Sequence, residues 1–474
     1  MIRTIALRGL ILGTLSLAVA STQPATAANI RWDANGNLPP DGNFHNFLSW
    51  NPNTVPQAGD TAIFDIAGQP TYLVTFLANA FSDGVEVRTG DVAFVSDRST
   101  ARTYDVTTGQ ADLTANGDSS LVIGVDGAPV VLNVGDELII GRSVGTGRVQ
   151  VSGAGSQLNT FTPGRVHTIG SGGFEGELNF RQFATGNLPG FYTLGVGDGS
   201  LGRLFVTDAS DIQIGTLSLA PGTTTGAAEL LVSSDSSITQ TGNASLTVGS
   251  DSGGPADLTV ADGTFTTGTG DVRVRATGDV LVEGTFNANS NVTVEGGLFE
   301  VLGTFNLAAG RSLTASGDAL VHLTGNDFAV RSGSTVAFNS GADFLIGSNL
   351  NIGTTGVAGD ATVTLDGSGV ELTQSGATRI TIGHAATGAG TLDAPEGTIE
   401  TGTLGMTINA TGTLNLGTDT TNARVNANGD ILVDGGTIHG GERGLLFLTP
   451  DQSLTARNDA QIHLARGGPS GLGA

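Results

Sequence analysis

The 474-residue chain contains no cysteine and no lysine, so all 20 of its basic residues are arginines. Without cysteine there are no disulfides, no thiolate-bound zinc and no thiol nucleophile. Acidic residues outnumber basic ones by 44 to 20, which gives a formal net charge of −24. Nucleic acid and anionic lipid both need basic patches on a protein. We therefore expect neither of them as a partner.

The first residues predict a signal peptide spanning residues 1–27. Arg3 and Arg8 precede a short apolar run, and Ala25-Thr26-Ala27 forms a cleavage pattern. The apolar run is too short to cross a bilayer, and no later segment reaches that length. We therefore expect an exported bacterial protein, extracellular or at the cell surface, without a transmembrane segment in the mature chain.

Glycine, in contrast, is abundant, with 74 residues, and it takes part in a repeat. The triplet Gly-Thr-Phe begins at Gly263, Gly284 and Gly303. Self-similarity at a period of about 20 residues indicates a solenoid, in which each repeat packs only against its neighbours. Apolar residues in this stretch recur every six to eight positions. Three such steps fill one period, which predicts three short strands and three turns per coil.

The predicted fold is all-β, a right-handed parallel β-helix with three sides, about 20 residues per coil and roughly 17 coils. Antiparallel hairpins would not return to the same side chain after one period, whereas stacked parallel coils would. Alternation in the run Val272-Arg273-Val274-Arg275 predicts valines inside and arginines outside. Phe265, Phe286 and Phe305 should then form a column of rings inside the coil.

A second repeat places an apolar residue directly before glycine, at the end of a strand. The copies are Ile140-Gly141, Ile169-Gly170, Leu194-Gly195, Val248-Gly249, Ile352-Gly353 and Ile382-Gly383. Glycine tolerates a positive φ, so these positions predict tight corners of the coil. The alternative is that they share a binding edge.

The chain divides into four segments. Residues 1–27 are the signal peptide, 28–80 an N-terminal cap, 81–445 the β-helix, and 446–474 a terminal strand with a flexible tail. Both tryptophans, Trp32 and Trp50, lie in the cap, where large aromatic side chains can close the end of the core. An exposed aromatic platform for carbohydrate is the alternative for these two residues.

The pattern of residues in the repeats and in the cap resembles that of a known class of secreted proteins. The cap contributes Ser49-Trp50-Asn51-Pro52, Val55-Pro56, Gly59-Asp60-Thr61-Ala62-Ile63-Phe64 and Tyr72-Leu73-Val74. Together with the apolar-glycine copies, these motifs resemble bacterial autotransporter passenger domains and the β-helical repeats of secreted PEP-CTERM-class proteins. The resemblance implies an exported right-handed β-helix that serves as an adhesin or surface scaffold. It transfers no catalytic residues.

Few residues carry recognisable chemistry. The six histidines are scattered without a pair at metal-ligand spacing, and the chain contains no phosphate-binding glycine loop. Paired carboxylates for glycoside cleavage could come from Glu295 with Glu283 or Glu300 on adjacent coils. Arg275, however, lies one period before Glu295 and should stack on it. We therefore assign no catalytic, cofactor-binding or metal-binding residue.

Two loops weakly resemble calcium-binding repeats, at Gly197-Asp198-Gly199 and at Asp251-Ser252-Gly253-Gly254. Such pairs are also ordinary turn residues. We expect no cofactor, with calcium left open.

The function that this sequence favours is an exported, non-enzymatic scaffold of the cell surface or extracellular matrix, similar to an adhesin. Its partner would be a cell-surface or matrix component, with polysaccharide among the candidates. The alternative is a polysaccharide-active enzyme, either a lyase or a glycoside hydrolase, built on the same fold.

Overall fold

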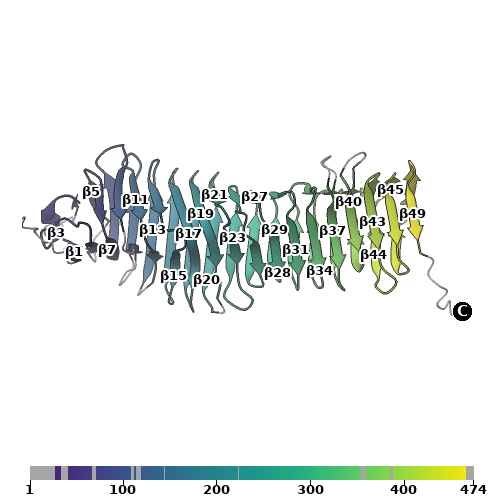
Figure 1. The fold of residues 1–474 in the computed structure, drawn as a ribbon, viewed down its shortest axis with the longest axis horizontal. Helices are drawn as coiled ribbons and strands as arrows, with labels where there is room; N and C mark the ends of the chain where they lie inside the picture. The colour runs from purple at the N-terminus through teal and green to yellow at the C-terminus, as the bar shows by residue number, and fades with distance from the viewer. Residues whose placement is uncertain are drawn as a thin grey trace, which may run out of the picture.

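The computed structural model describes residues 27–33, 41–66, 71–107, 111–113, 119–142, 145–222, 224–353, 359–384 and 388–465. The predicted signal peptide, except for its last residue, and residues 466–474 lie outside the described residues. The described chain forms a long rod of stacked strands that run across its axis (Figure 1).

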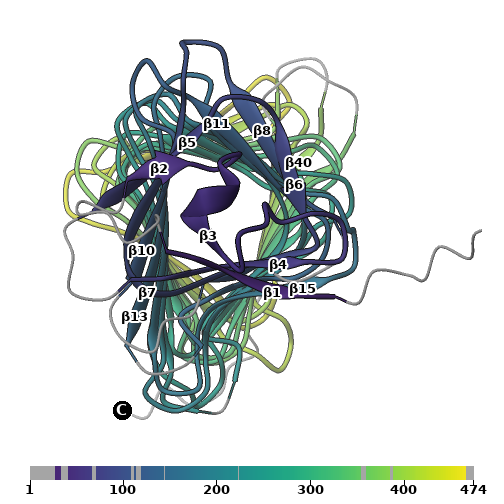
Figure 2. The same cartoon turned by 90° about the vertical axis from the view of Figure 1, so that its left-hand side faces the viewer.

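After the first coil, each coil contributes a strand, or part of a long strand, to each of three parallel columns, here called faces. The strands of successive coils superimpose around a common core when the rod is viewed from its N-terminal end (Figure 2). Three long strands, β7 (Gly84–Ser96), β17 (Thr185–Val196) and β19 (Asp211–Leu219), each bend around a corner and so belong to two faces. The architecture is therefore a parallel β-solenoid.

Face 1 contains the first halves of β17 and β19. From β33 onward its strands form a separate six-stranded sheet, and β33 packs beside β30 without being paired to it. Its other strands are β6 (Ala80–Ser82), β8 (Arg102–Val106), β11 (Val130–Val134), β14 (Gln157–Thr160), β21 (Ser237–Gln240), β24 (Thr264–Thr266), β27 (Thr285–Ala288), β30 (Thr304–Leu307), β33 (Phe328–Val330), β36 (Leu350–Ile352), β39 (Ile380–Ile382), β42 (Met406–Asn409), β45 (Ile431–Asp434) and β48 (Leu454–Arg457).

Face 2 contains the first half of β7 and the second halves of β17 and β19. Its other strands are β1 (Asn29–Trp32), β4 (Thr61–Asp65), β9 (Ala111–Leu113), β12 (Leu138–Ile140), β15 (Val166–Ser171), β22 (Leu246–Val248), β25 (Val272–Arg275), β28 (Val292–Glu295), β31 (Ser312–Ser316), β34 (Thr335–Asn339), β37 (Ala361–Asp366), β40 (Gly390–Ala394), β43 (Gly412–Leu416), β46 (Thr437–Gly440) and β49 (Gln461–Leu464).

Face 3 contains the second half of β7. Its other strands are β2 (Gly42–Asn43), β5 (Tyr72–Phe76), β10 (Ser119–Ile123), β13 (Thr146–Ser152), β16 (Glu175–Arg181), β18 (Leu201–Val206), β20 (Ala227–Val232), β23 (Ala256–Val260), β26 (Gly278–Val282), β29 (Leu298–Val301), β32 (Leu320–Leu323), β35 (Asp343–Ile346), β38 (Glu371–Gln374), β41 (Gly397–Glu400), β44 (Ala423–Ala427) and β47 (Gly444–Leu448).

Side chains alternate between the core and the surface, as the sequence predicts. Val272 and Val274 are fully buried, while Arg273 between them is exposed. The predicted phenylalanine column is confirmed, because Phe265, Phe286 and Phe305 are register partners on adjacent coils. The ring centroids of the first two are 5.5 Å apart and those of the last two 6.2 Å. The core is thus a continuous column of apolar side chains.

The coil is longer on average than the predicted period of about 20 residues. Between residues 81 and 445, the segment predicted as the β-helix, the solenoid has about 15 turns of roughly 26 residues, not roughly 17 shorter ones. The prediction was taken from the Gly-Thr-Phe stretch, where the turns are short. Elsewhere many strands as well as turns are longer. Strand β13, for example, has seven residues, and Leu121 lies opposite Val149 on the next coil.

Glycines form tight corners where the apolar-glycine repeat predicts them. Gly141 and Gly170 have φ values of 68° and 72°. A Cβ at Gly170 would lie 2.1 Å from the carbonyl oxygen of Leu201 on the next coil. These positions therefore need glycine for two reasons, backbone conformation and close contact between coils.

The N-terminal end is closed by aromatic side chains. Trp32 and Trp50 are 1% and 0% exposed, and their rings meet edge to face at 4.9 Å. Trp50 Nε1 donates a hydrogen bond to the carbonyl oxygen of Phe44 at 2.8 Å. A short antiparallel strand, β3 (Trp50–Asn51), pairs with β1 after the 3-10 turn Phe47–Ser49. Because both tryptophans are buried, they form no exposed platform for carbohydrate.

At the other end the parallel ladder runs to Leu464, within the segment 446–474 for which the sequence predicts a terminal strand and a tail. Strands β47, β48 and β49 pair in register with β44, β45 and β46. Side chains of this last coil that point toward the core, such as Leu446 and Ile462, are only partly buried.

Candidate functional site

The carboxylates that the sequence suggested for catalysis do not come together. Glu295 ends β28 on face 2, whereas Glu300 lies on β29 of face 3. Glu283 follows β26, in the turn that leads to face 1. Arg275 does lie opposite Glu295 on the next coil, as predicted, but its ion pair at 3.4 Å is with Asp251. These residues therefore form no acid-base pair.

Face 3 carries a column of charged side chains on its outer surface. From coil to coil, the register places in this column Asp91, Ser120, Arg148, Glu177, Arg203, Glu229, Asp257 and Asp279. Arg148 lies 3.9 Å from both Glu175 and Glu177. Arg203 contacts Glu175 and lies 3.3 Å from Glu229. The arginines thus join the carboxylates of adjacent coils across the face.

Where this column loses its arginines, carboxylates lie opposite one another. Burial raises the pKa of Asp257, and the neighbouring charges of Asp279 and Glu229 raise it further. Asp257 lies directly between those two residues in the parallel register. Among the described residues, however, no group of three or more histidine, aspartate or glutamate side chains is arranged to hold a metal ion.

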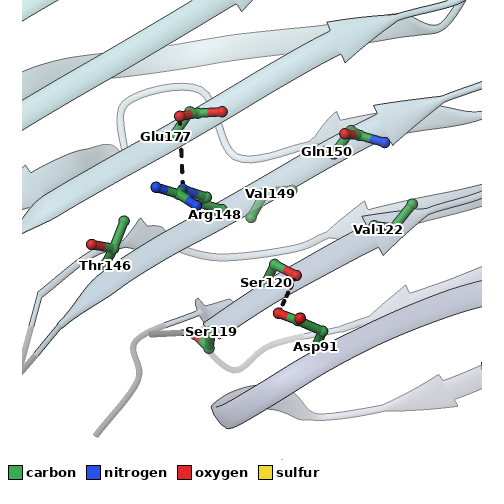
Figure 3. Close-up of a pocket in the computed structure, with 9 residues that line it drawn as sticks. All are labelled: Asp91, Ser119, Ser120, Val122, Thr146, Arg148, Val149, Gln150 and Glu177. Carbon is green, nitrogen blue, oxygen red and sulfur yellow. Dashed lines mark hydrogen bonds and ion pairs between the residues drawn. The ribbon is translucent and has the colours of Figure 1, made fainter. Parts of the chain in front are cut away.

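A hollow of about 270 Å³ lies at the beginning of the charged column, over β7, β10, β13 and β16 (Figure 3). Ser120 Oγ donates a hydrogen bond to Asp91 Oδ1 at 2.6 Å, and Arg148 points toward Glu177. Asp91 and Glu177 are separated by three coil steps, which corresponds to about 14 Å. Glycoside hydrolysis requires two carboxyl groups about 5–9.5 Å apart. The hollow therefore lacks the spacing of a glycosidase site.

Face 1 differs from face 3 because its outer columns are almost free of charge from β14 to β30. The first column contains Gln157, Thr185, Asp211, Ser237, Thr264, Thr285 and Thr304. The second column contains Asn159, Asn187, Gln213, Thr239, Thr266, Asn287 and Asn306. We refer to these two columns as the uncharged ladder, in which Asp211 is the one charged residue.

Register also brings together two histidines that sequence spacing did not pair. His439 on β46 lies opposite His463 on β49, and their rings stack with centroids 5.2 Å apart. Both are exposed. Metal-ligand spacing within one strand or turn does not reveal such a pair, because a solenoid brings together residues that are one coil apart in the sequence. With two imidazoles and no third ligand among the described residues, the pair does not by itself form a metal centre.

In the two loops considered for calcium, an aspartate carboxylate is hydrogen-bonded or ion-paired to another residue of the protein. Asp198 Oδ1 accepts hydrogen bonds from the backbone N–H and the hydroxyl of Thr225, at 3.0 and 3.4 Å. Asp251 lies in the ion pair with Arg275. Each loop therefore contributes one carboxylate that is already bound to a neighbouring coil.

One histidine belongs to the core. His167 is fully buried, stacks on Tyr192 with ring centroids 4.5 Å apart, and accepts a hydrogen bond from the backbone N–H of Leu138 at its Nδ1. Burial lowers the pKa of His167 to about 4. Its Nε2 is buried without a hydrogen-bond partner. A Cβ at Gly190 would lie 2.3 Å from this Nε2, so the core has no room for a ligand there.

In the part of the chain that the structure describes, no helix has the length and apolar character to cross a membrane.

No protein-family model matches this chain, and no curated protein matches it significantly. Among solved structures, the chain is similar to a hyper-glycosylated fragment of TibA whose glycosylation is catalysed by TibC. The identity is 15%, the match covers 80% of this chain and 100% of the fragment, and the TM-score is 0.21. A similarity this low carries no argument about fold or function.

Proposed function

We propose that this protein is an exported, non-enzymatic scaffold of the cell surface or extracellular matrix, similar to an adhesin. The observation that carries the proposal is the continuous parallel pairing of faces 2 and 3. On faces 2 and 3 every strand from β4 to β46 is hydrogen-bonded to the coils before and after it, and on face 1 the pairing is interrupted between β30 and β33. Such a rod is stiff, and its length of about 80 Å follows from the 17 strand spacings between β1 and β49 on face 2.

The surface chemistry supports a binding role rather than catalysis. The charged column of face 3 and the uncharged ladder of face 1 each extend over several coils, so a partner could contact many equivalent positions at once. Repeated weak contacts along one ligand raise the overall affinity far above that of a single contact. A catalytic site would instead concentrate its reactive groups at one point, whereas Glu295 and Glu300 lie on different faces and Glu283 lies in a turn.

Cell fractionation and adhesion assays test this proposal directly. The full chain, epitope-tagged and produced in its native cells, should be labelled on unpermeabilised cells or recovered from the medium or matrix. Deleting the gene should reduce attachment of the cells to one another or to their substratum. Retention of the protein inside the cell, or unchanged attachment, would contradict the proposal.

The enzymatic alternative has a test of its own. The purified protein is incubated with neutral and acidic polysaccharides, and reducing ends and unsaturated products are measured. We expect neither product above the level of a heat-denatured control. Release of either one would replace the scaffold with a hydrolase or a lyase.

A further inference from the structure

The outer surface of the solenoid is divided by charge. The acidic and basic residues of face 3 form the charged column, whereas seven consecutive coils of face 1 present hydroxyl and amide groups with Asp211 as the only charge. This chain has 44 acidic residues, so a face of fourteen outward positions with one acid departs from the rest of the surface.

Many groups of the uncharged ladder are free to bind a ligand. Gln157, Thr185, Asn187, Gln213 and Thr239 are partly or fully exposed. None of these five side chains has an intramolecular hydrogen bond to any described residue. Other ladder groups do form bonds along the face. Ser237 Oγ donates to Asp211 Oδ1 at 2.5 Å, and Asn159 donates to Asn133 at 2.9 Å. Toward the C-terminal end of the ladder, Asn287 donates to Thr266, Asn306 to Asn287, and Asn326 to Thr304. A ligand could therefore bind without disrupting the coil.

The ladder also has a shape that suits an extended ligand. A hollow of about 410 Å³ follows it over four successive coils, β14, β17, β19 and β21, and is lined by residues of both columns. Its long direction is the axis of the rod. The two columns are about 7 Å apart, and equivalent residues repeat at about 4.8 Å along the axis. The surface therefore offers a regular double row of donors and acceptors.

The charge distribution selects among ligand classes. Acidic residues lie in the turns that precede face 1, at Asp235, Asp262 and Glu283, so an anionic chain would be repelled from the edge of the ladder. A cationic ligand would gather at those acids, because Asp211, the one acid within the ladder, already accepts a hydrogen bond from Ser237. Protein interfaces are enriched in aromatic residues and arginine, which the ladder lacks. The ligand class that remains is a neutral polymer with hydroxyl groups along its length.

We infer that the uncharged ladder of face 1 binds a neutral polysaccharide chain lying along the axis of the rod. Asn and Gln side chains each offer a donor and an acceptor, and so can bind two adjacent sugar hydroxyls. Successive coils repeat these contacts along the glycan. This inference rests on the proposed surface function and names the chemistry of its partner.

A pair of charge-introducing variants tests the inference. Gln213→Glu keeps the size of the side chain but removes two donors and adds a negative charge within the ladder. Gln150→Glu makes the same change on face 3, in the hollow of Figure 3, and serves as the matched control. Asn187→Asp repeats the test one coil away from Gln213. Thermal melting checks that all three variants keep the fold.

Binding is measured on an array of neutral hexasaccharides (cello-, chito-, laminari- and mannohexaose) with oligogalacturonate as the acidic comparison, followed by titration calorimetry. We expect at least one neutral glycan to bind and oligogalacturonate not to bind. Gln213→Glu and Asn187→Asp should each weaken binding roughly tenfold, and Gln150→Glu less than about twofold.

Three results would overturn the inference: no neutral glycan bound, oligogalacturonate bound equally well, or equal losses for the face 1 and face 3 variants. An assay of cell attachment shows whether only this inference is wrong or whether the proposed surface function is wrong as well. If attachment depends on the protein but is unchanged by Gln213→Glu, the scaffold stands and the ladder is not its binding surface. If attachment does not depend on the protein, the proposed function fails first.

Discussion

Phe286 lies at the centre of the interior column, with the rings of Phe265, Phe299 and Phe305 within 6.2 Å. Its neighbour Thr285 points outward on the same strand. We expect Phe286→Ala to destabilise the protein by about 3–5 kcal/mol, because the cavity opens in the middle of a stack that cannot collapse. Thr285→Ala should cost about 0.5 kcal/mol or less. Urea denaturation followed by circular dichroism measures both, and equal losses would contradict the interior position of the rings.

His167 makes stability depend on pH. Its pKa is about 4 in the folded chain, below the ordinary value of 6.5. Between these values the unfolded chain binds a proton that the folded chain does not, so stability falls as the pH drops from 6.5 to 4. The loss is on the order of 2–3 kcal/mol. His167→Phe should remove this part of the pH dependence.

Urea denaturation of the parent protein, His167→Phe and His322→Gln at pH 7.5 and 4.5 measures the effect. His322 is an outward histidine on face 3, so its variant controls for the loss of any imidazole. Carboxylate titration affects all three proteins alike. If the parent and His167→Phe lost the same stability on acidification, the buried histidine would not be the cause.

At the scale of single elements, some turn positions restrict the choice of residue more strongly than the strands do, because they accept only glycine. Gly170 combines a φ of 72° with a contact to the next coil that leaves no room for a Cβ, whereas Gly164 has a φ of 97° and no atom within 4 Å of that position. We expect Gly164→Ala to cost about 1–2 kcal/mol from backbone strain alone. Gly170→Ala should cost about 2–5 kcal/mol, because the coils must also move apart. Melting temperatures of the two variants measure the difference, and equal effects would show that contact between coils is not limiting.

The strands and their inward faces could be predicted from the sequence, but the composition of each outer face could not. Alternation places Val272 inside and Arg273 outside without knowledge of any neighbour. The stack of His439 on His463, in contrast, depends on the lengths of the turns between them, and one additional residue would separate the two rings. For the same reason the sequence does not reveal the uncharged ladder. It also does not show that Glu300 lies on a different face from Glu295, or that Glu283 lies in a turn. The right-handed sense of the coil stays a prediction.

At the scale of the whole molecule, each coil contacts mainly its two neighbours, so the rod should tolerate loss of one complete coil. Deleting residues 265–285 joins Thr264 to Phe286, which then takes the place of its register partner Phe265. We expect a folded protein that is shorter by about 4.8 Å. Deleting residues 265–275 removes part of a coil, moves the following strands to the wrong faces, and should unfold the chain beyond that point. Small-angle scattering and circular dichroism distinguish the two proteins, and equal disruption would argue against independent coils.

The stacking of coils in register, on which the scaffold and its ladder depend, can be measured directly because the chain contains no cysteine. Spin labels on introduced cysteine pairs, Thr185 with Thr285 and Gln157 with Thr304, lie four and six coil steps apart in one column. Pulsed EPR should give distances between backbone positions of about 19 and 29 Å after correction for the length of the labels. Distances that do not increase by one strand spacing per coil would contradict the parallel solenoid and everything inferred from its faces.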